Sequence, residues 1–410
     1  MNLASRMTAG TAFCVLLLGL SSAGADDWPQ WRGPNRDNKV TGFTAPSTWP
    51  KELTQKWKVT IGVGDASPVL VGDKIYVFTR QGGDETTLCL KAADGSEIWH
   101  DKYAAPAVTG APSQHPGTRS TPAVAEGKVC TLGAAGTLSC LDAEKGTVAW
   151  RKETEHPKFW DASSPIIVDG KCIAEVGTDG AGGIAAYDLT SGEEKWKWPG
   201  AGPAYSSPVL LTVDGVKQIV ALTEKSVVGV GAADGKLLWE IPFKAGGMGS
   251  YNSITPLVDG STVYYAREGT GTTAVKVEKK GDGFTASQVW SKSNSAGKYN
   301  TPVLKDGLIY GLAGGGRGAT TLFCMKADTG DMAWTDSTKR GECGAILDAG
   351  DVLLALSSDS QLIVFKPSDK GYMEVAKYKV ADSPTWADPI IAGNRVFVKD
   401  KDSLTLWTLE

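Results

Sequence analysis

Short runs of alternating apolar and polar residues, separated by turn-forming residues, fill most of this 410-residue chain. The stretch from Thr121 to Trp150 shows the pattern clearly. One apolar run follows Pro122, a Glu-Gly turn comes next, and further runs separated by Gly-containing turns lead to a last run that ends at Trp150. Alternation with a period of two residues between such turns is typical of antiparallel strands. The stretch therefore predicts one four-stranded antiparallel sheet.

The same unit recurs along the chain. A Gly-bearing turn returns at intervals of 43 to 55 residues, at Gly72, Gly127, Gly170, Gly215, Gly260, Gly307, Gly350 and Gly393. A leading proline opens most units, at Pro68, Pro122, Pro165, Pro208, Pro256, Pro302 and Pro389, and Ala345 stands in the remaining place. A period of about 40 to 50 residues built from short strands is the sequence signature of a β-propeller. The repeats therefore predict an all-β fold with eight blades of four antiparallel strands.

The last repeat lacks a closing strand at the C-terminus. Residues 53–57, Leu-Thr-Gln-Lys-Trp, resemble such a strand but precede the first full repeat. We expect this N-terminal strand to complete the sheet begun by residues 388–409, because ring closure removes the exposed sheet edges through which chains aggregate. The predicted organisation is a signal peptide over residues 1–25, a docking arm over residues 26–52 and one propeller over residues 53–410.

Aromatic residues end nearly every repeat, with Tyr378 in the weakest case. A Trp side chain buries about 150 to 250 Å², so one Trp at the same place in each sheet is typical of packing between blades. We interpret seven of them as a structural girdle: Trp57, Trp99, Trp150, Trp196, Trp239, Trp290 and Trp334.

The first 25 residues differ in composition from the rest. Arg6 is their only charged residue, an apolar run spans Ala12 to Leu20, and Ala23-Gly24-Ala25 fits a signal-peptidase site. The run is too short to cross a bilayer, which takes about 20 residues in a helix. We therefore expect a periplasmic or otherwise extracytoplasmic protein that is exported by a cleavable signal peptide, lacks a transmembrane segment and is monomeric.

Charge and composition narrow the function classes. Lys and Arg total 42 against 46 Asp and Glu, a formal net charge of −4. The chain therefore lacks the excess of basic residues that is typical of nucleic-acid-binding proteins. Fifty Gly and 14 Trp within 41% hydrophobic content suit a large turn-rich β core. The partner expected is an envelope protein or a small ligand.

Three motifs carry a family resemblance: Ala92-Ala-Asp-Gly-Ser-Glu-Ile-Trp99, Leu189-Thr-Ser-Gly-Glu-Glu-Lys-Trp196 and Lys326-Ala-Asp-Thr-Gly-Asp-Met-Ala-Trp334. They resemble the pyrroloquinoline-quinone (PQQ) type repeat of quinoprotein-like eight-bladed propellers, and the match covers residues 53–410. The chain is similar to the propeller lipoproteins of the outer-membrane β-barrel assembly machinery, which implies a non-enzymatic scaffold in the cell envelope. It departs from them because Cys14 lies within the apolar run, where no lipid-attachment motif forms.

A second resemblance lies between Asp27 and Arg36, Asp-Trp-Pro-Gln-Trp-Arg-Gly-Pro-Asn-Arg, which looks like the opening of many exported bacterial propellers. Its prolines and glycine forbid a long helix or strand. We predict an ordered arm that docks on the ring through Trp28 and Trp31.

The resemblance also implies an alternative function, a PQQ-dependent periplasmic oxidoreductase that acts on alcohols or sugars. Such enzymes hold PQQ on the channel axis between a Trp and a ring formed by two adjacent cysteines, and they use Ca²⁺ and an Asp base. This chain has no Cys-Cys pair and no Asp-rich calcium loop. We expect no resident cofactor and no metal, and PQQ with calcium belongs to the alternative.

No pattern of nucleophile, base and metal ligand identifies a catalytic residue. The chain lacks a Gly-x-Ser-x-Gly motif, and His100, His115 and His156 fall in or beside connections without metal-ligand spacing. Cysteines in separate blades are too far apart to bridge, but Cys130 and Cys140 lie on adjacent strands of one hairpin and form a possible disulfide.

Aromatic and charged residues precede the leading prolines, where the connections between blades surround one mouth of the channel. Long loops over a rigid scaffold are common recognition sites. The candidate binding face consists of Asp65, Arg119, Trp160, Tyr205, Tyr251, Tyr299, Glu342 and Trp386. Two interpretations stay open: these aromatic side chains bind a partner, or they close the channel.

Overall fold

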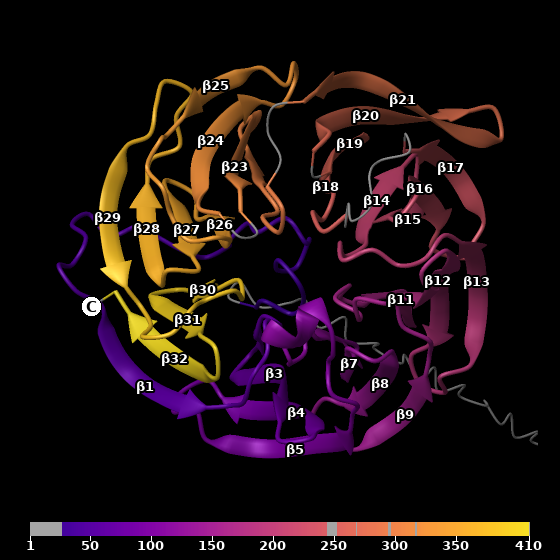
Figure 1. Cartoon of the computed structure of the whole chain (residues 1–410), viewed down its shortest axis with the longest axis horizontal. Coiled ribbons are helices and arrows are strands. Elements are labelled where there is room, and N and C mark those ends of the chain that lie inside the picture. The colour runs from indigo at the N-terminus through magenta and orange to yellow at the C-terminus, as the bar shows by residue number, and fades with distance from the viewer. Residues whose placement is uncertain (1–26, 244–251, 268, 294–296, 316–317, 410) are drawn as a thin grey trace, which may run out of the picture.

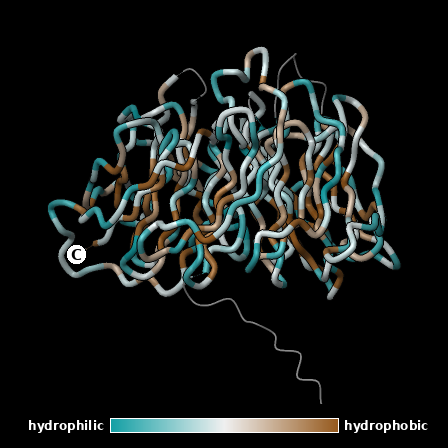
Figure 2. Tube along the Cα trace, turned by 90° about the horizontal axis from the view of Figure 1, so that it is seen from below, coloured by the Kyte–Doolittle hydropathy of each residue, from teal (hydrophilic) through white to brown (hydrophobic). Residues whose placement is uncertain are grey.

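Eight four-stranded antiparallel sheets surround a central channel in the computed structural model of the chain (Figure 1). The structure describes residues 27–243, 252–267, 269–293, 297–315 and 318–409. Hydrophobic segments run through the wall of the ring, and hydrophilic loops lie at both faces (Figure 2). The prediction of an all-β, eight-bladed propeller is confirmed.

Each blade begins at the channel and adds strands outward. The strands of the first four blades are β2 (Val69–Val71), β3 (Lys74–Gln81), β4 (Asp84–Lys91), β5 (Glu97–Ala104); β6 (Ala123–Ala125), β7 (Lys128–Leu132), β8 (Thr137–Asp142), β9 (Val148–Glu153); β10 (Ile166–Val168), β11 (Lys171–Thr178), β12 (Ala181–Asp188), β13 (Glu194–Gly200); β14 (Val209–Val213), β15 (Val216–Leu222), β16 (Ser226–Gly231) and β17 (Leu237–Pro242). A short 3₁₀ helix, η1 (Ala111–Gln114), lies in the connection between β5 and β6.

The second half of the ring repeats this order. Its strands are β18 (Leu257–Asp259), β19 (Thr262–Arg267), β20 (Gly271–Lys280), β21 (Gly283–Lys292); β22 (Val303–Lys305), β23 (Leu308–Gly314), β24 (Thr320–Lys326), β25 (Met332–Thr335); β26 (Gly344–Asp348), β27 (Leu353–Ser357), β28 (Gln361–Phe365), β29 (Glu374–Lys379); and, in blade 8, β30 (Ile390–Ala392), β31 (Arg395–Lys399) and β32 (Ser403–Thr408).

Strand β1 (Thr54–Thr60) closes the ring, as the sequence predicts. It pairs antiparallel with β32, from Thr54 opposite Thr408 to Thr60 opposite Ser403. Blade 8 therefore combines the first strand of the chain with the last three.

The Trp side chains connect neighbouring blades. The indole N–H of Trp99 in blade 1 donates to the carbonyl of Ala143 in blade 2 at 3.2 Å, and Gly146 lies on the face of the same ring. Gly146 has a φ of +70°, and a Cβ there would lie 2.5 Å from the indole, so this place requires glycine on both counts. Equivalent bonds join Trp57 to Ala92, Trp150 to Leu189, Trp196 to Ala232, Trp290 to Ala327 and Trp334 to Ser368.

Trp239 differs from the other six. Its indole donates to Gln218 Oε1 of its own blade at 2.6 Å. The reason lies in blade 5, where β20 and β21 are ten residues each and are joined by a tight turn in place of the longer turns that supply the acceptor carbonyl in the other blades.

A ring of hydroxyl groups joins the inner ends of the blades, a feature that the sequence analysis missed. Thr121 shows the pattern, because its N–H donates to Ser164 Oγ at 2.9 Å and its own hydroxyl accepts the N–H of Ser67 at 3.0 Å. The same bond runs from Asp388 to Ser67, Ser164 to Ser207, Ser207 to Thr255 and Thr255 to Thr301. Gly344 interrupts the ring in blade 7, where Asn300 Oδ1 accepts its N–H.

Candidate functional site

The N-terminal arm, residues 27–52, enters the middle of the ring (Figure 1). The N–H of Gly72, in the turn between β2 and β3, donates to Asp27, so the arm lies on the side of the inner hairpin turns. We call this side the arm face. We call the opposite side, where the connections between blades lie, the connection face.

Arm residues bond to all eight blades. Trp28 pairs through its backbone with Leu70, and Arg32 Nη2 donates to Pro302 O at 2.6 Å. Arg36 Nη1 donates to Ser164 O and Pro208 O. Further bonds join Pro29 to Val124, Trp31 to Thr255, Asn38 to Ile346 and Asp388, and Asn38 and Val40 to Asp348. The arm therefore covers much of one mouth of the channel.

Two buried cations lie inside this arm, and neither forms an ion pair with a described carboxylate. Arg32 and Arg36 are 0% and 2% exposed, and their guanidinium partners are mainly backbone carbonyls. Burial lowers the pKa of Arg32 to about 10 and that of Arg36 to about 9, so both stay charged at neutral pH. Asp388 lies close enough to favour the charge of Arg32, while burial raises the pKa of Asp388 itself.

On the connection face, five consecutive connections bond to one another. His115 Nδ1 lies 2.7 Å from Asp65 Oδ2, and the His115 ring meets the edge of Trp386 with 4.6 Å between centroids. Arg119 lies over the ring of Tyr205, 6.0 Å from its centroid, and both side chains donate to Phe159 O. We call Asp65, His115, Arg119, Tyr205 and Trp386 the platform.

The platform joins segments that are far apart in sequence. Its residues come from the connections that precede blades 8, 1, 2 and 4, and Phe159 belongs to the connection before blade 3. The bond to Asp65 raises the pKa of His115, and the charge of Glu342 adds to this effect, against burial and Arg119. Protonated His115 is therefore favoured by the two carboxylates of this mouth.

The other predicted residues of this face occupy different surroundings. Tyr299 is 45% exposed in the connection before blade 6, where Ser253 donates to the neighbouring Lys298 carbonyl. Trp160 is 7% exposed: it stacks on His156 at 4.6 Å and packs on Val108 and Ala134, below the surface. Tyr251 lies outside the described residues.

Three buried carboxylates lie beneath the connections of blades 1 to 3. Glu85 accepts the hydroxyl of Tyr103 at 2.6 Å and the N–H of Ala134. Glu175 accepts weaker bonds from Ser163 and Ala204, and burial raises the pKa of Glu175 to about 8. Both carboxylate oxygens of Asp161 are buried without a hydrogen-bond partner, and burial raises the pKa of Asp161 strongly.

The described cysteines are all buried free thiols in this structure. Cys130 and Cys140 are directly opposite each other on β7 and β8, as the hairpin prediction requires, and remain unbridged. Within the described ranges, no three His, Cys, Asp or Glu side chains are arranged to hold a metal ion. The same residues include no helix with the length and apolar character of a membrane span.

Fold and blade contacts define an eight-bladed propeller of the quinoprotein-like class. The chain belongs to the family described as outer membrane protein assembly factor BamB, whose model matches residues 37–207 and 83–336. The structure of BamB from Moraxella catarrhalis has a TM-score of 0.64 at 16% identity, over 87% of this chain and 97% of that one. At this identity the likeness shows the fold alone.

Dehydrogenases are also similar. Methanol dehydrogenase subunit 1 of Methylorubrum extorquens is 28% identical over 173 residues, which is 37% of this chain and 26% of the enzyme. The quinohemoprotein alcohol dehydrogenase of Comamonas testosteroni has a TM-score of 0.71 at 14% identity, over 95% of this chain and 81% of the enzyme. The chain spans between about a fifth and a third of the length of the curated relatives it matches.

Proposed function

We propose that this chain is an exported, non-enzymatic propeller that binds a protein of the cell envelope through its connection face. The observation that carries the proposal is the platform, because hydrogen bonds and ring contacts of its side chains join five connections in one surface. A surface held in place before binding loses less entropy on association than mobile loops do. The family match to an outer-membrane assembly factor supports an extracytoplasmic place of action.

The chemistry of the platform suits protein recognition. Trp386 and Tyr205 provide aromatic area, Arg119 provides a cation, and Asp65 with Glu342 provides carboxylates around one mouth. Aromatic residues and Arg are enriched at the centres of protein interfaces. Exposed Tyr299 extends the same kind of surface toward blades 5 and 6.

The alternative, a PQQ-dependent oxidoreductase, is favoured by the dehydrogenase relatives. The residues that would hold the quinone in the way the resemblance implies do not fit it well. Adjacent cysteines are lacking in the sequence, the described residues assemble no metal-binding group, and Arg32 and Arg36 of the arm occupy the channel from one side. Fold alone does not confer the activity.

Two measurements test the proposal. First, the protein is incubated with PQQ and Ca²⁺, freed of unbound quinone, and assayed for quinone absorbance and for dye reduction with alcohols and sugars. We expect neither retained quinone absorbance nor dye reduction. Retained quinone with turnover would establish a PQQ-dependent oxidoreductase instead.

Second, envelope extracts are passed over the immobilised native chain and over the Tyr299→Ala and Trp386→Ala variants. We expect a partner retained by the native chain to be lost from the variants while their melting temperatures stay within a few degrees of native. Val289→Ala, at an exposed position on the outer strand β21, is the control. Equal capture by all four proteins would refute a site on the connection face.

A further inference from the structure

The arm leaves part of its own mouth of the channel uncovered. The second residue after each leading proline occupies the same place in every inner strand. Leu70 and Ile391, on blades 1 and 8, are buried in a cluster to which arm residues contribute. Leu210, at the same place on blade 4, is 37% exposed, unusually high for a large aliphatic side chain in an inner strand. The uncovered arc therefore lies beside blade 4, whereas Leu304, at the same place on blade 6, is 8% exposed.

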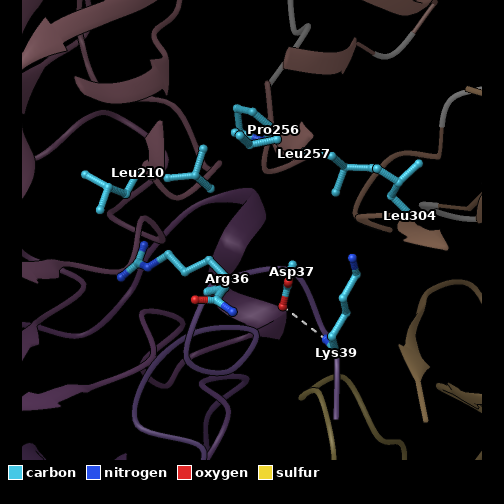
Figure 3. Close-up of a pocket in the computed structure, with 10 residues that line it drawn as sticks. Arg36, Asp37, Lys39, Leu210, Pro256, Leu257 and Leu304 are labelled. Atoms are coloured by element: carbon cyan, nitrogen blue, oxygen red, sulfur yellow. Dashed lines mark hydrogen bonds between the residues drawn. The ribbon is translucent and has the colours of Figure 1, made fainter. Parts of the chain in front are cut away.

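A pocket of about 180 Å³ lies in this arc, between the arm and blades 4 to 6 (Figure 3). One wall is aliphatic and consists of Leu210, Pro256, Leu257 and Leu304 from three consecutive inner strands or their leading residues. The other wall is the arm, which contributes Asn35, Arg36, Asp37 and Lys39. Because the Arg36 guanidinium is bonded to carbonyls of blades 3 and 4, the charges that face a ligand are those of Asp37 and Lys39.

Asp37 and Lys39 form no ion pair with each other among the described residues, although the Lys39 charge lies near enough to favour the ionised form of Asp37. Asp37 accepts the backbone N–H of Lys39 at 3.2 Å, which fixes the carboxylate at the pocket. The Lys39 side chain extends from the arm toward the wall formed by Leu257 and Leu304 (Figure 3). Burial raises the pKa of Asp37 against the lowering effect of the Lys39 N–H and of the Lys39 and Arg32 charges, so this carboxylate still gains from an added cation.

We propose that this pocket binds a free aliphatic α-amino acid such as leucine. The α-ammonium group would lie on Asp37, the α-carboxylate on Lys39, and the side chain against the Leu210, Pro256 and Leu304 wall. Both charges of the ligand then meet an opposite charge, and its apolar part meets apolar surface.

The size of the pocket supports a ligand of this class. A cavity of about 150 Å³ lined by aliphatic and aromatic side chains admits benzene, so 180 Å³ suits a molecule that buries a similar number of atoms. Sites for drug-sized ligands occupy about 300 to 1,000 Å³, which makes this pocket too small for a three-ring quinone. A peptide C-terminus offers the carboxylate and the side chain, but its amide would leave Asp37 without a cation.

Isothermal titration of the full chain with L-leucine tests the proposal. Three ligands each lack one recognised group: N-acetyl-leucine lacks the ammonium, leucinamide lacks the carboxylate and glycine lacks the side chain. We expect leucine to bind and each of the three to bind at least about tenfold more weakly. Absence of heat with leucine at millimolar concentrations would overturn the proposal, and N-acetyl-leucine binding as tightly as leucine would assign the pocket to a peptide C-terminus instead.

Matched variants locate the binding. Asp37→Asn and Lys39→Gln should each weaken leucine about tenfold or more while the melting temperature changes little, because both substitutions keep size and backbone. Asp73→Asn and Lys56→Gln, at exposed positions elsewhere on the ring, should bind leucine like the native chain. Unchanged affinity in both arm variants would overturn the proposal. The connection face is not involved, so this result is independent of the partner assay.

Discussion

Removal of the Arg36 side chain tests whether the arm stabilises the ring. Its guanidinium makes four hydrogen bonds: Nη1 donates to Pro208 O at 2.7 Å and to Ser164 O at 3.2 Å, Nη2 donates to Pro165 O, and Nε donates to Gln30 Oε1 at 3.0 Å. One side chain thus joins the arm to blades 3 and 4.

The expected loss follows from these contacts. A hydrogen bond to a charged group contributes about 1.5 to 3 kcal/mol, and burial of the cation offsets part of that gain. Arg36→Ala leaves three channel carbonyls without this donor, and because each buried acceptor left unsatisfied costs about 1 to 3 kcal/mol, we expect a loss of about 3 kcal/mol or more. Arg36→Lys keeps the charge, but one ammonium cannot replace the planar guanidinium at all three carbonyls, so we expect an intermediate loss.

Urea unfolding followed by Trp fluorescence measures the change. The control is Arg395→Ala, because Arg395 makes one long bond to Ala392 O at 3.4 Å and lies over the Phe397 ring. We expect this control to lose about 1 kcal/mol or less. A loss in Arg36→Ala no larger than that of the control would refute the claim that the arm is part of the folded ring.

Three further predictions concern the blades and the buried charges. Gly146→Ala should destabilise the chain by about 2 to 4 kcal/mol in urea unfolding, because the added Cβ meets the Trp99 ring. Gly72→Ala, with open space around the added Cβ, should cost about 1 kcal/mol. Equal losses in the two variants would contradict the role of Trp99 in packing between blades. Burial raises the pKa of Glu175 from 4.5 to about 8, so the folded chain keeps a proton that the unfolded chain releases, and stability should fall as pH rises through that window. Glu175→Gln should make the melting temperature depend less on pH. An unchanged pH dependence would contradict the assignment of this effect to Glu175. Asp65→Asn should lower the pKa of His115 in an NMR titration, since the bond to Asp65 is the main cause that raises this pKa. An unchanged pKa of His115 would contradict the hydrogen bond between His115 and Asp65 in the platform.

The blades could be predicted from the sequence because each repeat carries its own local signal. Turn glycines set the hairpins, and a Trp opposite a small residue sets the packing, as where Trp99 faces Cys89 and Trp150 faces Cys140 across β-pairs. These signals depend on spacing within about 45 residues, and eight copies reinforce one another. Ring closure could also be predicted, because the last repeat lacks its closing strand and residues 53–57 resemble one.

The site was less accessible to the same reasoning. The depth of the arm in the channel depends on bonds from Arg36 to carbonyls more than 120 residues away. Because every residue has a backbone carbonyl, the sequence does not show which carbonyls accept these bonds. The platform depends on the fold of the long connection that brings His115 to Asp65 and Trp386. The hydroxyl ring did leave a signal, Ser or Thr before most leading prolines, as in Thr121-Pro122 and Ser164-Pro165.

Site-specific photo-cross-linking in cells tests the central claim, that the connection face binds an envelope protein. A photoreactive residue is placed at position 299 on the connection face and, separately, at position 289 on the outer strand β21, where the native side chains are 45% and 54% exposed. We expect a discrete protein adduct from position 299 and none from position 289. No adduct from position 299, or the same adducts from both positions, would contradict it.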